Sequence, residues 1–239
     1  MTHYKQNTEY CFGDGRLFDA DVKILNTEAK LALEQILQDK NSGNLPIVSI
    51  AETTESAEFT EIEDLASNIR NNFDNLVVLG TGGSVLCGHA LSAFKQTEFL
   101  SAKPRVIFLQ NIDPITINSL FTSLDISRTA FLAISKSGVS IETLTQLFIC
   151  LERVKNCNIS SCNISKQFFF IAMPTDNSLR RISQKFGIKV YDHDPNIGGR
   201  FSIFANVGLV PHVVNWSHKS PHVFGAMGAY VYGALRGAL

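Results

Sequence analysis

The sequence has little of what marks secreted, membrane or nucleic-acid-binding proteins. Its five cysteines form no CxxC pair, which favours reduced thiols in a cytosol over a disulfide framework. Residues 1–10 are polar and show no signal peptide, and no apolar run approaches the ~20 residues of a membrane span. The net charge is −1, without the basic excess of a non-specific nucleic-acid binder. We therefore expect a soluble, cytoplasmic protein without nucleic-acid or membrane partners.

Motifs for the common cofactors and metals are missing or incomplete. No GxxxxGK[ST] sequence occurs, which argues against a P-loop. Residues 80–84 (GTGGS) resemble the start of a dinucleotide fingerprint, but Val85 stands where its last glycine belongs. His218 and His222 have the helical spacing of zinc ligands, yet Pro221 lies between them and no acidic ligand is adjacent. We expect no metal and no organic cofactor.

Short apolar runs alternate with helical patterns in the middle of the chain. The predicted strands are 76–80, 105–110, 129–134, 168–173 and 188–191. The predicted helices are 61–73, 84–94, 113–121, 140–155 and 179–186, with 156–166 as a polar linker. A helix between each pair of strands implies a doubly wound five-stranded parallel sheet of flavodoxin-type order, 2-1-3-4-5. The fold class is therefore α/β.

The regions on either side of this repeat have a different character. Residues 1–56 form an N-terminal helical segment, with a surface helix predicted over 27–37. The sheet domain is expected to cover 57–192. Residues 193–239 begin with a connecting loop and continue as a stretch rich in glycine, alanine and valine without a βα repeat.

Two hydroxyl-rich turns, 81–84 and 135–138, follow the first and third predicted strands. In the 2-1-3-4-5 order these turns meet at the point where the sheet reverses direction, which is where ligands bind. Ser140 is predicted to begin the next helix as its N-cap, with its hydroxyl accepting from a first-turn N–H. The helix should bury one face that carries Ile141, Leu144, Leu147, Phe148 and Leu151.

A single such turn is most often an ordinary polar connection between a strand and a helix. Two of them at the switch point favour a phosphate or sugar-phosphate site, because free N–H groups and the positive end of the helix dipole converge there. Farther along, Arg200 follows two glycines that let the backbone approach a ligand closely. The alternative is a flexible linker with a surface arginine.

Three motifs together resemble those of the phosphoglucose isomerase family, whose domains have the sugar-isomerase (SIS) fold. The family's GxGGS, SK[ST]xx[ST]xET and GGR[FY]S patterns appear at residues 80–84, 135–143 and 198–202. The resemblance covers roughly residues 62–211. It implies an aldose–ketose isomerase that interconverts glucose 6-phosphate and fructose 6-phosphate in glycolysis and gluconeogenesis, without a cofactor.

The resemblance also implies roles for individual residues. The implied substrate-binding residues are Gly83, Ser84, Ser135, Lys136, Ser137, Ser140, Glu142 and Gly199. The serines of the second motif and the Lys136 backbone would hold the 6-phosphate, Gly83 and Ser84 would line the sugar pocket, and Glu142 would order the site. Arg200 is the implied catalytic residue, because its guanidinium would stabilise negative charge on an enediolate at C1 and C2.

One departure from the family weakens the analogy. The family's general base is a glutamate in a later DQxGVE segment, and its ring-opening histidine and C-terminal lysine also lie in later segments, which the 239 residues do not contain. Arg200 cannot replace the base, because arginine does not deprotonate. We therefore expect an N-terminal piece of a longer enzyme that includes the start of a second SIS domain. It would act as a homodimer or with a missing C-terminal half.

Two other functions fit parts of the pattern. The chain could be a non-catalytic SIS module that binds sugar phosphates and regulates a partner, which the missing base favours and the intact GGR[FY]S motif disfavours. It could also belong to another SIS isomerase, acting on an amino sugar or arabinose phosphate. The same motif argues against that possibility.

Overall fold

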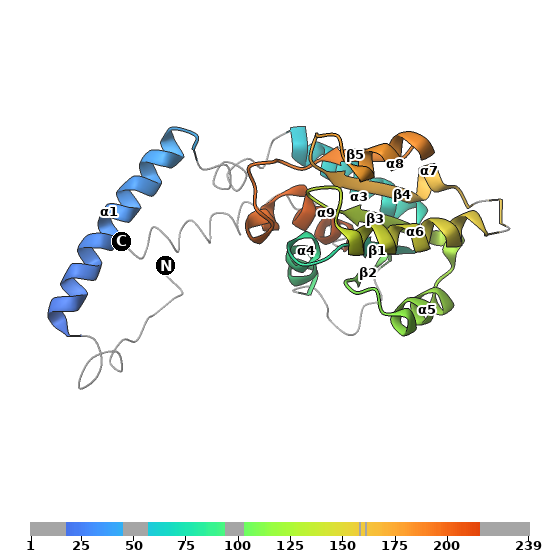
Figure 1. Ribbon diagram of the computed structural model, residues 1–239, viewed down its shortest axis with the longest axis horizontal. Helices are drawn as coiled ribbons and strands as arrows, with labels where there is room; N and C mark the ends of the chain where they lie inside the picture. The colour runs from blue at the N-terminus through green and yellow to red at the C-terminus, as the bar shows by residue number, and fades with distance from the viewer. Residues whose placement is uncertain (1–17, 45–56, 94–102, 158, 161, 216–239) are drawn as a thin grey trace. The chain divides into compact units, whose positions relative to one another are not determined.

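The computed structural model describes residues 18–44, 57–93, 103–157, 159–160 and 162–215 (Figure 1). The chain divides into two units, one formed by Met1–Thr53 with Pro221–Leu239 and the other by Thr54–Ser220. The described part of the first unit is the helix α1 (Asp19–Asn41), which confirms and extends the helix predicted over 27–37. His218 and His222 lie outside the described residues. Within the described ranges, each helix is too short or too polar to cross a membrane.

The second unit is built on a parallel sheet with the strand order β2-β1-β3-β4-β5, as predicted. Its strands are β1 (Asn75–Leu79), β2 (Arg105–Leu109), β3 (Thr129–Ile134), β4 (Phe168–Ala172) and β5 (Lys189–Asp192). Every adjacent pair is parallel. Each strand begins and ends within one residue of its predicted limit, because the apolar runs coincide with the buried stretches of backbone.

Helices connect the strands and cover the sheet. They are α3 (Ala57–Asn72), α4 (Gly83–Ala93), α5 (Pro114–Ser123), α6 (Ile141–Lys155), α7 (Ile164–Gln167), α8 (Ser178–Phe186) and α9 (Asn206–Asn215), with 3₁₀ turns η2 (Ile126–Arg128) and η3 (Gly199–Phe204). The N-cap of α5 and the C-cap of α8 are the residues that the sequence pattern favours at helix ends. Asp113 accepts from the Thr116 N–H at 2.7 Å, and Gly187, at φ +66°, ends α8. The short helix α7 begins inside the stretch expected to be a linker and ends one residue beyond it.

Both faces of the sheet are covered. Val77, Phe131 and Phe170, which point to one face, share a core with apolar residues of α5, α6 and α8. The alternate strand residues, including Leu76 and Leu132, are also fully buried. Helices α3 and α4 both pack against α9, and α9 also contacts β2. Figure 1 shows α6 in front of the sheet.

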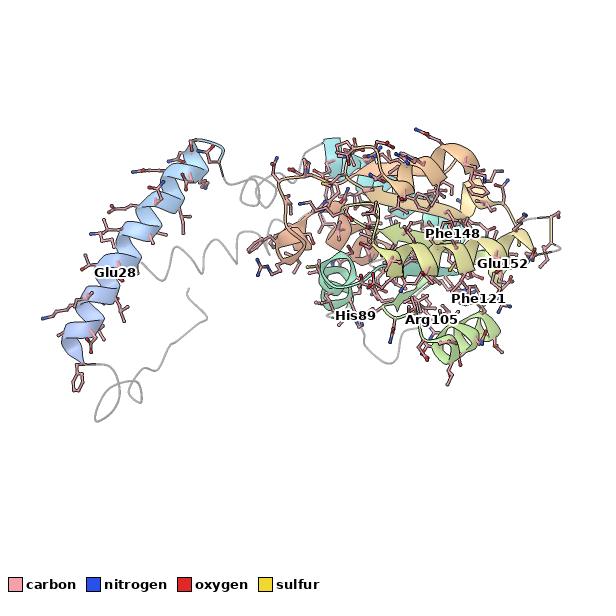
Figure 2. The ribbon with its side chains drawn as sticks, in the orientation of Figure 1. Glu28, His89, Arg105, Phe121, Phe148 and Glu152 are labelled. Atoms are coloured by element: carbon pink, nitrogen blue, oxygen red, sulfur yellow. The ribbon has the colours of Figure 1, made fainter. Side chains whose placement is uncertain are left out.

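One expectation about α6 was wrong. Leu147 and Leu151 are buried as predicted, but Ile141 is 74% exposed and Phe148 is 54% exposed. Phe148 and Glu152 lie on the part of α6 that faces away from the sheet (Figure 2). The apolar arc of this helix is wider than the strip that the sheet covers, so the edge that carries Ile141 and Phe148, seven residues apart, remains in solvent.

Helix α9 is the element that the sequence pattern did not indicate. Pro211 stands inside it, and residues 206–214 are all buried. The Arg70 guanidinium of α3 donates to the Val213 carbonyl at 2.6 Å, and the Asn215 amide donates to the Ser92 carbonyl of α4 at 3.2 Å. Residues beyond 192 therefore contribute a helix that packs with α3 and α4. The division of the chain at residues 56 and 192 stays a prediction.

Candidate functional site

The turn after β3 is closed by the hydroxyl of Ser135. This buried side chain accepts from the Gly138 N–H at 3.1 Å and donates to the Ser140 hydroxyl at 3.0 Å. Ser140 is the N-cap of α6, as predicted, but its hydroxyl accepts no bond from the helix, contrary to our expectation. The Ser135 hydroxyl lies against it instead. The Ser140 proton is therefore left available to a ligand, as are N–H groups of the first turn of α6.

The same turn is fixed from behind by the connection between β4 and α8. Gly138 has a φ of +69°, and a Cβ at this position would lie 2.1 Å from Oδ1 of the buried Asn177. The Gly138 carbonyl accepts from the Leu179 N–H at 3.2 Å. Ser137 and Glu142 are exposed at the outer side of the turn and in the first turn of α6. One side of this turn is therefore packed against the buried Asn177, whereas the side that carries Ser137 is exposed to solvent.

Lys136 connects this turn to the segment that precedes Arg200. Its ammonium donates to the carbonyls of Pro195 and Ile197, at 2.7 Å each. Its own carbonyl accepts from the Met173 N–H at 3.0 Å. The motif resemblance implied a role only for the Lys136 backbone, and nothing in the sequence indicated the path of the side chain.

The first glycine loop meets the GGRFS segment directly. A Cβ on Gly83 would lie 2.8 Å from the Cα and carbonyl carbon of Gly199, so the two backbones touch. The Ser202 hydroxyl donates to the Gly199 carbonyl at 2.7 Å and lies 3.3 Å from the Gly83 carbonyl, 119 residues away in the chain. The Cys87 thiol lies 3.7 Å from the Gly199 carbonyl. Two motifs that are distant in sequence therefore form one junction.

Arg200 projects from this junction in the 3₁₀ turn η3. Its side chain is exposed, and its guanidinium lies 5.8 Å from the centre of the Phe201 ring. Within the described ranges the guanidinium makes no hydrogen bond or ion pair. Its charge is thus free to act on a ligand. Ser84 is half-buried in the first turn of α4, next to the contact of Gly83 with Gly199.

Two ionisable groups near the segment before Arg200 have shifted pKa values. Burial lowers the pKa of His193, and the Lys136 ammonium lowers it further, so the imidazole is neutral at pH 7. Its Nδ1 atom is buried and has no hydrogen-bond partner among the residues that the structure describes. Burial raises the pKa of Glu58, and the carboxylate of Asp194 adds to the effect. Neither group was singled out from the sequence.

The candidate residues thus gather into one connected arrangement. The turn after β3 brings Ser135 and Ser140 together, Lys136 joins that turn to the segment before Gly198, and Gly83 touches Gly199. What each residue binds stays a prediction. Among the described residues, no group of three or more His, Cys, Asp or Glu side chains is arranged to hold a metal ion. His89, labelled in Figure 2, lies on α4, and its ring centre is 4.8 Å from that of Phe108.

Comparison with solved structures defines the class of the protein. The fold is similar to that of a hypothetical protein from Thermus thermophilus, with a TM-score of 0.70 and 24% identity over 91% of this chain and 50% of that one. A glucose-6-phosphate isomerase from Chlamydia trachomatis gives a TM-score of 0.58 and 23% identity over 73% of this chain and 33% of that one. The chain is an α/β protein of SIS-like fold.

Sequence comparison narrows the class to a family. The family model described as phosphoglucose isomerase matches residues 50–223, and the chain belongs to this family. It is 34% identical to a glucose-6-phosphate isomerase from Carboxydothermus hydrogenoformans over 83% of this chain and 44% of the relative. It is 28% identical to a probable glucose-6-phosphate isomerase from Methanococcus maripaludis over 73% of this chain and 42% of the relative. The chain spans less than half the length of each of these two relatives.

Proposed function

We propose that this chain is part of an aldose–ketose isomerase that interconverts glucose 6-phosphate and fructose 6-phosphate. The observation that carries the proposal is the meeting of three motifs at one edge of the sheet. Gly83 touches Gly199, and Lys136 reaches the carbonyls just before Gly198. The names of the relatives supply the substrate, and the arrangement of the loops supports it.

The phosphate is assigned to the turn after β3. The hydroxyls of Ser137 and Ser140, with backbone N–H groups at the start of α6, offer donors to its oxygens. The buried Ser135 hydroxyl holds Ser140 in place. The sugar then extends toward Gly83 and Ser84, with C1 and C2 beside Arg200. We assign Glu142, in the first turn of α6, the role of ordering the exposed side of the turn after β3.

The reaction is an internal transfer of a proton between C2 and C1, with no net oxidation. Removing the C2 proton gives an enediolate, whose negative charge the Arg200 guanidinium stabilises without itself moving a proton. Returning this proton to C1, together with transfer of the O2 hydroxyl proton to O1, completes the change from aldose to ketose. None of the residues to which we assign a role acts as the base that carries this proton. The chemistry calls for no metal or redox cofactor.

Calorimetric titration with glucose 6-phosphate tests this assignment. Replacing Ser137 with alanine removes one donor to the phosphate and should weaken binding about 5- to 10-fold. Arg200→Ala should leave phosphate binding nearly intact but abolish any turnover. Ser119→Ala, at an exposed serine on α5, is the matched control and should change nothing. Equal binding by the Ser137 variant would overturn the phosphate assignment.

Assembly and location belong to the same proposal. We assign the protein to the cytoplasm, and the free thiols of Cys87, Cys150, Cys157 and Cys162 are consistent with a reducing compartment. We assign it a homodimeric state, or association with a second polypeptide that completes the site. Sedimentation equilibrium of the purified protein would distinguish a dimer from a monomer.

A further inference from the structure

The side chain of Lys136 does not point at the proposed phosphate position but crosses to another loop. Its Nζ atom lies 2.7 Å from the Pro195 carbonyl and 2.7 Å from the Ile197 carbonyl. Both lengths are typical of charge-assisted hydrogen bonds. Among the described residues no carboxylate pairs with this ammonium. Its hydrogen-bonding capacity is therefore directed at the backbone of residues 195–197.

We propose that Lys136 is a positioning residue, which holds the turn before Gly198 against the phosphate turn and so couples phosphate binding to the placement of Arg200. The Lys136 ammonium and the carbonyls of Pro195 and Ile197 together form what we call the Lys136 bridge. The proposal rests on the proposed function, because it assigns the phosphate to the turn that carries Lys136. It adds a role for a side chain that the motif resemblance assigned only through its backbone.

Among the described residues, the N–H groups of Asn196 and Ile197, in the turn that Lys136 holds, donate only to the nearby Asp194. The Asn196 N–H donates to the Asp194 carboxylate at 2.7 Å, and the Ile197 N–H donates to the Asp194 carbonyl at 3.2 Å. Such bonds shape a turn but do not fix its place on the protein. The Lys136 bridge ties it to a residue about 60 positions earlier in the chain. Without the bridge, the turn keeps the packing of the buried Ile197 side chain but loses its hydrogen bonds to the turn after β3.

The segment that carries Arg200 is thereby held from two sides. On one side, Ser202 and the contact of Gly83 with Gly199 fix it to the first glycine loop. On the other side, the Lys136 bridge fixes it to the phosphate turn. Lys136 itself is anchored, because its carbonyl accepts from the Met173 N–H at the end of β4. A phosphate that orders the turn after β3 would thus also order Arg200.

A simpler role would be electrostatic attraction alone. Carbonyl partners are neutral, so the Lys136 charge is not cancelled and would attract any phosphate ligand. The two roles differ in what they predict. A purely electrostatic Lys136 strengthens the binding of all sugar phosphates alike. If Lys136 positions Arg200, it strengthens chiefly the binding of sugar phosphates whose other end contacts Arg200.

Two ligands that share a phosphate separate these roles. D-arabinonate 5-phosphate carries a carboxylate that mimics the enediolate, whereas D-arabinitol 5-phosphate carries a neutral hydroxymethyl group there. Calorimetry on the full chain should show that Lys136→Met lowers the preference for the acid about tenfold. Arg200→Ala should lower it similarly, and the double variant should lose little more. Lys136→Arg, which keeps a charged donor, should recover part of the preference.

The controls make the result decisive. Lys166→Met removes an exposed lysine of α7 and should leave the preference unchanged. If Lys136→Met weakens both ligands equally, or its effect adds in full to that of Arg200→Ala, the positioning role is overturned. If the unmodified chain binds neither ligand, the proposed function fails instead.

A measurement without ligand keeps the two failures apart. Arg200 is exposed, so trypsin can cleave after it when the segment opens. Mass spectrometry should show faster cleavage after Arg200 in Lys136→Met than in the unmodified chain or in Lys166→Met. Cleavage at the unmodified rate would overturn the Lys136 bridge whether or not a sugar phosphate binds.

Discussion

At the scale of single residues, the junction of the two glycine loops has no room for a side chain at Gly83. A Cβ there would lie 2.8 Å from backbone atoms of Gly199, which cannot rotate away. Gly83→Ala should therefore separate the loops, destabilise the fold by about 1–3 kcal/mol and weaken sugar-phosphate binding. Urea unfolding and calorimetry measure the two effects.

Gly199→Ala is the matched control for this prediction. A Cβ on Gly199 would meet Gly83 at 3.4 Å, an ordinary van der Waals contact. The folding stability of this variant should stay within about 0.5 kcal/mol of the unmodified chain. If the two alanine variants unfold at the same urea concentration, the close contact at Gly83 is not a structural requirement.

His193 provides a prediction about pH. Burial, followed by the Lys136 ammonium, lowers the pKa of His193 in the folded state. Between that lowered pKa and the ordinary value of about 6.5, the unfolded chain binds more protons than the folded one, so stability falls as the pH drops through this window. The contribution is fully present above pH 6.5. His193→Gln should flatten the decline in urea unfolding between pH 7 and 5, and parallel curves would contradict the assignment.

The sequence predicted which of the candidate residues lie close together better than it predicted the bonds between them. Ser135 and Ser140 lie in one turn as expected, because the strand and helix around them are strongly patterned. The bond between their hydroxyls depends on the side-chain conformers of two serines, which no pattern encodes. The hydrogen bond from Lys136 to Pro195 depends on how two loops, 59 residues apart in the chain, pack against each other.

At the scale of elements, α9 depends on a cation from α3. Arg70, with 20% of its side chain exposed, donates to the Val213 carbonyl near the end of α9 at 2.6 Å. Arg70→Met keeps the apolar stem but removes the donor to that carbonyl and the ion pair of Arg70 with Glu63. It should cost about 1.5–3 kcal/mol of stability, measured by urea unfolding.

An exposed ion pair gives the comparison for Arg70. Arg181 pairs with Asp176 on the surface, where both side chains are 70% exposed. Because surface pairs contribute little, Arg181→Met should shift the urea midpoint much less than Arg70→Met does. Equal losses from Arg70→Met and Arg181→Met would show that α9 does not depend on the bond to α3.

The strands and α9 differ in how readily a sequence reveals them. The central strands β1, β3 and β4 are short apolar runs that are buried on both faces, so their limits follow from residue type. Helix α9 contains Pro211, a residue that argues against a helix interior. Its packing on α3 and α4 depends on the path of residues 193–205. That path is set by loop and 3₁₀ backbone, which patterns of residue type do not predict.

At the scale of the whole molecule, binding and turnover should separate. The 239 residues contain no DQxGVE segment, and a positioned general base contributes about 10²–10⁴ in rate. A polypeptide of these residues, prepared alone, should bind sugar phosphates weakly and isomerise them at least about 100-fold more slowly than a relative that has the glutamate. A coupled assay on contaminant-free protein measures this, and turnover at the relative's rate would contradict it.

The most direct test of the site is a crystal structure of the chain with glucose 6-phosphate. We predict that the phosphate lies within hydrogen-bonding distance of Ser137, Ser140 and the first N–H groups of α6. The sugar should extend toward Gly83, with C1 and C2 near the Arg200 guanidinium. A phosphate bound elsewhere, or a sugar pointing away from Arg200, would contradict the assignment of these loops to one sugar-phosphate site.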